Sequence, residues 1–238
     1  MPLLDVVTYF CQRTNLPVPA TVIGSSDQQV LQVKALLEEE GIDLTKRIAS
    51  QATTFEASIT TLAVEDQGAI TAYATNGFSF IKNRTIWDRS SRLPIVGPLD
   101  GEDWQMLKAV VSTGPRYQYR LRGNHLLINP IPTAGLSWYF EYGSKNWILG
   151  ADGTTYKQFF TLDTDTLLFP EDLVLMGLRW RWKKEKGLEY AEDFRTYEMQ
   201  LKDFAGRDGS KRTLKMDMPQ RQWSGPGIYI PSGSWKIP

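Results

Sequence analysis

The stretch that decides the fold is residues 169–209, FPEDLVLMGLRWRWKKEKGLEYAEDFRTYEMQLKDFAGRDG. It predicts two helices joined by a short turn. Pro170 suits the first helical turn, where its missing N–H group costs no hydrogen bond. Gly187 is the residue type that ends a helix and turns the chain. We therefore expect a helical hairpin whose first helix covers Glu171–Lys186.

The two helices of this hairpin differ in their apolar pattern. The second helix carries one stripe at helical spacing, made of Tyr190, Phe194, Tyr197, Leu201 and Phe204. The first helix is apolar on two faces, one with Leu173, Met176 and Trp180 and the other with Leu175, Leu178 and Trp182. Such a helix normally has neighbours on both sides. The second neighbour is either the rest of this chain or another copy, and we predict an interface between copies at Leu175, Arg179, Trp180 and Trp182.

The N-terminal part of the chain predicts further helices. Residues 2–14 have the pattern of a short amphipathic helix, and Ser25 or Ser26 can cap a second helix that runs through Glu40. We expect Gly41 to end this helix and Asp43 to cap a short segment up to residue 50. The acidic run 38–40 lies at the unfavourable end of the helix dipole, so we expect it to be solvated and frayed.

Residues 51–169 predict a β-rich insertion between the two sets of helices. The run 55–64 is rich in β-branched residues, residues 117–121 and 125–129 flank a Gly-Asn turn typical of a hairpin, and 136–142 alternates. Residues 71–80 and 84–89 are weaker strand predictions, and 101–111 predicts a helix with Trp104, Leu107 and Val111. The fold class is therefore α+β, with a body over 1–209 in which helices 1–50 and 170–209 pack together.

Residues 210–238 differ in composition from this body. They are rich in proline and glycine, carry a net charge of +4 against −4 for the rest, and lack a helical period. We interpret them as an extended docking tail. Its predicted anchors are large aromatic and aliphatic side chains: Trp223, Ile228, Tyr229, Ile230 and Trp235.

The composition offers no reaction chemistry. Lys plus Arg equals Asp plus Glu at 27 each, so the overall charge does not favour nucleic-acid binding. With one cysteine, Cys11, and one histidine, His125, an intrachain disulfide and a histidine-based metal cluster are excluded. Asp163 and Asp165 lack the calcium-loop pattern, so we interpret them as loop and cap residues. We predict no catalytic residues, no metal site and no cofactor.

The start of the chain and its hydropathy bear on location. MPLLDVVTYFCQRTNLP has neither a basic start nor a long apolar run, so we expect no signal peptide. No stretch reaches the ~20 apolar residues that span a bilayer. We therefore expect synthesis in a cytoplasm and no membrane partner.

The run Arg179–Lys184 has two interpretations. Basic and aromatic residues together could form a nucleic-acid patch. Neighbouring residues on a helix point about 100° apart, however, so the run does not form one surface. We favour packed tryptophans, and arginines that pair with acidic side chains across an interface.

Several segments together resemble a known family. They are PEDLVLMGLRWRWKKEKGLEYAEDFRTYE in the hairpin, LTKRIAS at 44–50, WDRSSRLPIVGPLDGEDWQMLKA at 87–109 and YRLRGNHLLINPIPTAGLSWYFEYGSKNW at 119–147. In this order of motifs, residues 28–209 resemble the head-to-tail adaptor (connector or neck) proteins of tailed bacteriophages.

The resemblance implies a structural virion protein at the head–tail junction. Its copies would form a ring, by resemblance a dodecamer, between the portal protein and a tail or nozzle protein, with genomic DNA passing through the lumen without sequence-specific binding. The alternatives are a nucleic-acid-handling or other phage enzyme, which needs a cleft of convergent titratable groups, and a nucleic-acid-binding module.

Overall fold

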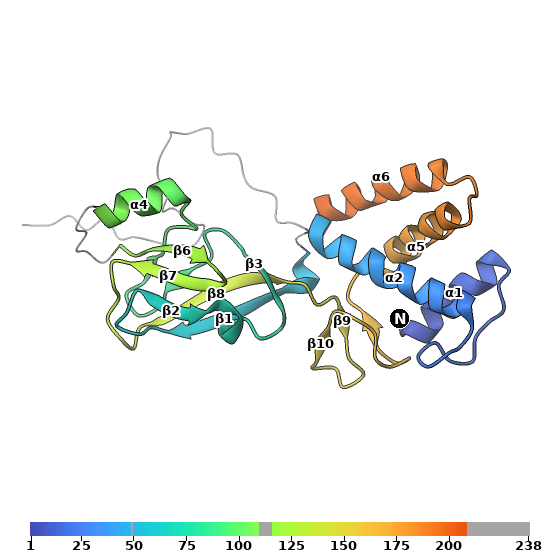
Figure 1. The fold of residues 1–238 in the computed structure, drawn as a ribbon, viewed down its shortest axis with the longest axis horizontal. Coiled ribbons are helices and arrows are strands. Elements are labelled where there is room, and N and C mark those ends of the chain that lie inside the picture. The colour runs from blue at the N-terminus through green and yellow to red at the C-terminus, as the bar shows by residue number, and fades with distance from the viewer. Residues whose placement is uncertain (49, 110–115, 209–238) are drawn as a thin grey trace, which may run out of the picture.

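The computed structural model describes residues 1–48, 50–109 and 116–208. The fold is α+β, as the sequence predicts. The molecule is elongated, with a group of long helices at one end and two β-sheets at the other (Figure 1). The N-terminal helices and the C-terminal hairpin come together although most of the chain separates them in sequence. The described residues contain no helix with the length and apolarity needed to cross a membrane.

Four long helices form the helical end. Their bounds are α1 Leu3–Thr14, α2 Gln28–Arg47, α5 Glu171–Glu185 and α6 Ala191–Asp208. The predicted hairpin is confirmed, and Gly187 turns the chain between α5 and α6 with a φ of 68°. Asp27, rather than a serine, caps α2 by accepting a hydrogen bond from the backbone N–H of Gln29 at 2.9 Å.

The predicted end of the second helix at Gly41 is wrong. Helix α2 continues through Gly41 to Arg47, and no new helix begins at Asp43. A Cβ atom at position 41 would overlap the indole ring of Trp147, which is fully buried. Gly41 therefore admits the tryptophan into the helix surface instead of ending the helix.

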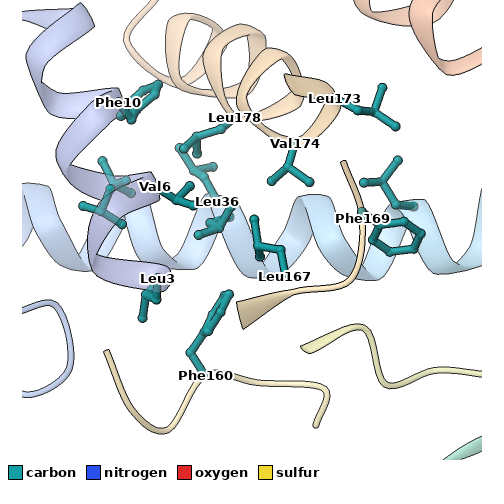
Figure 2. Packing of buried hydrophobic residues seen from close by; sticks show 14 of the residues in the cluster. Leu3, Val6, Phe10, Leu36, Phe160, Leu167, Phe169, Leu173, Val174 and Leu178 are labelled. Carbon is teal, nitrogen blue, oxygen red and sulfur yellow. The ribbon is translucent and has the colours of Figure 1, made fainter. Parts of the chain in front are cut away.

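The helical end has its own hydrophobic core. Figure 2 shows side chains from α1, α2 and α5 converging on one region, with Phe160 and Leu167 closing it from below. Residues 147–169, which the sequence assigns to the β-rich insertion, contribute Trp147, Ile148, Phe160 and Leu167 to this core. This segment forms a small sheet in the order β10-β9-β11, from β9 Ile148–Leu149, β10 Tyr156–Lys157 and β11 Thr166–Leu167.

The β end is built on two antiparallel sheets around a second core. The larger sheet has the order β1-β8-β4-β5, and β3 also pairs with β8. The smaller sheet has the order β2-β7-β6. The strands are β1 Thr54–Thr60, β2 Asp66–Ala69, β3 Phe78–Ile81, β4 Trp87–Asp88, β5 Leu93–Pro94, β6 Gln118–Arg122, β7 His125–Asn129 and β8 Ser137–Ser144. The helices here are short: a 3₁₀ turn Gln51–Thr53, α3 Ile70–Tyr73 and α4 Gly101–Ala109.

The strands predicted from clear alternation or from β-branched runs are confirmed, whereas the weaker prediction over 71–80 is correct only in part. The hairpin is confirmed as β6 and β7, with Gly123 and Asn124 at positive φ in the turn. The runs 55–64 and 136–142 correspond to the paired strands β1 and β8. The strand predicted over 71–80 is wrong in its first half, because residues 70–73 form α3. The predicted helix from 101 is α4; Val111, its last expected residue, lies outside the described residues.

Candidate functional site

A groove lies between helices α1, α5 and α6. Its volume is about 800 Å³. Its lining combines aromatic, aliphatic and charged side chains: Tyr9, Phe10, Arg13, Thr14, Asp172, Leu175, Met176, Arg179, Trp182, Lys183, Asp193, Thr196 and Gln200. We call this feature the helical groove. Among its α5 residues, Asp172 and Arg179 are exposed, and the other four are partly buried.

The floor of the helical groove is apolar. Trp182 meets the edge of Phe10 of α1, with ring centres 6.0 Å apart and planes at 76°. Leu175 and Met176 are partly buried against the helical core. The second half of α1 and the side of α5 from Leu175 to Trp182 thus present an apolar strip that is still partly open to solvent.

At the rim of the groove, basic side chains outnumber acidic side chains. Asp193 of α6 accepts a hydrogen bond from Lys183 and also pairs with the Nε atom of Arg179 at 3.3 Å. One carboxylate is thus shared by two cations. Arg13 stacks over the ring of Tyr9, with its guanidinium carbon 5.6 Å from the ring centre. Asp172, at the start of α5, adds the other negative charge of the lining.

The structure divides the predicted interface set. Leu175, Arg179 and Trp182 line the helical groove together. Trp180 does not: its side chain is buried against α6, with ring centres 5.0 Å from Phe194 and 6.1 Å from Tyr197. Trp180 therefore packs in the core of its own chain, which does not favour it as a contact to another copy.

The arginines of the same helix pair within the chain, not across an interface as the sequence suggested. Arg181 points at α2, where its Nε atom lies 2.7 Å from Glu40 and its Nη2 atom 3.0 Å from Asp43, and it also pairs with Glu39. Arg179 pairs with Asp193 on the other side of α5. Trp180 and Arg181 are buried while Arg179 and Lys184 are exposed, so the run forms no single surface.

The acidic run 38–40 is not a frayed helix end. Glu40 is fully buried inside a continuous α2, and Glu38 accepts a hydrogen bond from the backbone N–H of Phe160 at 3.2 Å. Burial raises the pKa of Glu40 above its ordinary value, although Tyr197 and Arg181 act in the opposite direction. Gly177 makes room for this pair, because a Cβ atom there would overlap the Glu40 carboxyl group. In the sequence, the only local sign of this buried pair is that Gly177 precedes Arg181 by one helical turn.

The other polar candidates have structural partners. Asp163 accepts hydrogen bonds from the backbone N–H groups of Val22 and Ile23, at 3.2 and 2.7 Å. Asp165 is fully buried and pairs with Lys157 at 2.9 Å. Both carboxylates therefore hold loops, in agreement with their interpretation as loop residues.

The single histidine and the single cysteine differ in their surroundings. His125 is about half exposed and lies 2.9 Å from Asp66, whereas Cys11 is buried, which raises the pKa of its thiol. Over the described ranges, no group of three His, Cys, Asp or Glu side chains is arranged to hold a metal ion.

The predicted anchors of the docking tail, Trp223, Ile228, Tyr229, Ile230 and Trp235, lie outside the described residues. Comparison of the chain with protein-family models and with curated protein sequences gives no match.

Proposed function

We propose that the protein is a structural virion component, a head-to-tail adaptor whose copies form a ring between the portal and the tail around the DNA channel. The observation that carries the proposal is the helical groove. Its α5 side chains Leu175, Met176 and Trp182 pack against the helical core but stay only partly buried, in a groove that is open between α1, α5 and α6. Open apolar surface of this kind is typical of proteins that assemble with others.

The segments that resemble the adaptor family support the same proposal. They include the end of α2, the stretch from β4 to α4, the strands β6 to β8 and the hairpin of α5 and α6. These segments occur in both halves of the molecule. The resemblance therefore concerns the whole scaffold and not one isolated motif.

The tail extends the proposal to the portal. Residues 210–238 carry a charge of +4 and large aromatic side chains. We expect them to dock in an acidic groove of the portal protein, where a ring of identical tails would bind with avidity. Attachment that depends on this charge should weaken at high salt.

Genetic removal of the protein tests the proposal. Without it, we expect infected cells to produce heads that lack tails. Supplying the full chain from a plasmid should restore complete particles. Tailed, infectious particles in the absence of the protein would contradict the proposal.

A further inference from the structure

The charge of the helical groove limits the kind of side chains that can bind in it. Arg179 and Lys183 share the single carboxylate of Asp193, and Arg13 has no carboxylate partner among the described residues. With Asp172 included, the lining still has one more positive charge than negative. An occupant should therefore bring a large apolar side chain for the floor and a carboxylate for the rim.

The chain's own tail does not match these requirements. Residues 210–238 carry five basic side chains and one acidic side chain. Like charges brought together at an interface oppose binding. The aromatic residues of the tail would suit the floor, but its charge would be repelled by the rim.

Helix α4 does match them. Its first turn exposes Glu102 and Asp103, for which the described residues provide no ion-pair partner. Met106 follows at positions i+4 and i+3, on the same face of the helix, and is 65% exposed. Trp104 on the opposite side is buried, and Lys108 at the end of α4 pairs with Glu65 of the β end. The exposed face of α4 thus combines a large apolar side chain with two unpaired carboxylates.

The position of α4 in the molecule shows that its exposed face can reach the helical groove only from another copy. Helix α4 lies at the opposite end of the elongated molecule from α1, α5 and α6, the helices that line the helical groove (Figure 1). One chain cannot bring them together, but two copies can. We propose that the helical groove of one copy receives Glu102, Asp103 and Met106 of α4 from the next copy.

This contact joins two different surfaces, so it is heterologous. Heterologous contacts repeat from copy to copy and close into a ring when the rotation permits. In this arrangement Met106 covers the strip of Leu175 and Trp182, and the two carboxylates face Arg179 and Lys183. The inference rests on the proposed ring-forming function and names the surfaces that build the ring.

Cysteine cross-linking of two separate variants tests the pairing. One full-length chain carries Met106→Cys and the other, made distinguishable by a tag, carries Met176→Cys in the groove. Mixed and oxidised, with and without portal rings, they should give a mixed dimer in excess of both homodimers and of the wild-type background from Cys11. Homodimers alone, or no mixed dimer above that background in either condition, would overturn the proposal.

Charge reversal supplies a second test that does not depend on oxidation. Arg179→Glu and Asp103→Arg should each weaken association of copies about tenfold or more, and mixing them should restore part of it through one reversed pair. Lys184→Glu is the matched control, because Lys184 is exposed on α5 but does not line the groove, and it should leave association unchanged. Equal effects of Arg179→Glu and Lys184→Glu would overturn the proposal.

The failures of the two proposals are distinguishable in the same preparation. A mixed dimer that forms while portal rings remain bare supports the contact and contradicts the adaptor function. Portal rings that carry the protein without any mixed dimer support the adaptor function and contradict the contact.

Discussion

Replacing Arg181 by methionine should destabilise the chain strongly. Methionine keeps most of the apolar volume but removes the charge that faces Glu40, which has no exposed surface. The Arg181 side chain is itself 10% exposed. Removing one partner of a buried ion pair costs roughly 3–5 kcal/mol, because the other charge stays buried without compensation. We expect the free energy of unfolding, measured by urea denaturation at pH 7, to fall by that amount.

Arg179 provides a matched control on the same helix. Its side chain is 48% exposed and its pair with Asp193 is 3.3 Å long, so Arg179→Met should cost no more than about 1 kcal/mol. The double variant Glu40→Leu/Arg181→Met should recover much of the loss, since neither buried charge remains. The reasoning is refuted if Arg181→Met lowers the free energy of unfolding no more than Arg179→Met does. It is also refuted if the loss in the double variant equals the sum of the losses from Glu40→Leu and Arg181→Met alone.

The pH dependence of Glu40→Gln examines the same pair from the other side. The raised pKa of Glu40 means that the folded chain binds this proton more tightly than the unfolded chain does. Its contribution to stability is present below the unfolded pKa, near 4.5, and is lost as the pH rises through the folded pKa. Wild type should therefore match Glu40→Gln at low pH and become less stable relative to it as the pH rises. An opposite trend would show that the pKa of Glu40 is lowered.

The remaining predictions concern the groove, metals and the tail. Trp180→Ala should lower the free energy of unfolding by roughly 3–5 kcal/mol, whereas Trp182→Ala should cost roughly 1–2 kcal/mol and mainly reduce association of copies, as sedimentation velocity would report. Chelation should leave the melting temperature unchanged; a marked fall would reopen the loop at Asp163 and Asp165 as a metal site. Deleting residues 210–238 should leave a folded body that fails to attach stably to heads, and infectious particles carrying the truncated protein would end the docking hypothesis.

Much of the fold follows from local sequence patterns. The hairpin of α5 and α6 is predictable because Pro170 and Gly187 mark its start and its turn, and because the stripe of α6 has a clear helical period. The β6–β7 hairpin is predictable because its Gly-Asn turn has the positive φ values that such turns require. These features depend on neighbours in sequence, so one sequence suffices.

The wrong predictions at Gly41 and Glu40 arise from contacts between residues that are distant in sequence. Gly41 and Gly177 sit inside helices because Trp147 and Glu40 need the space that a side chain would fill. Both partners lie far away in sequence, so glycine at position 41 resembles a helix end. For the same reason Glu40 resembles a solvated residue until Arg181, on a distant helix, is placed against it.

The candidate site was predictable in part. The two-sided apolar pattern of α5 identifies Leu175 and Trp182 as residues in need of a second neighbour. It cannot show that Phe10 of α1 already covers one edge of that face, or that Trp180 faces α6. The acidic face of α4 was not anticipated, because its significance depends on the cations of a groove at the other end of the molecule.

Electron microscopy of the purified protein mixed with purified portal rings tests the central claim most directly. We predict a ring of copies stacked on one face of the portal, sharing its symmetry axis and continuing its channel. Portal rings that remain bare at saturating protein, under low-salt conditions that favour charged contacts, would contradict the claim.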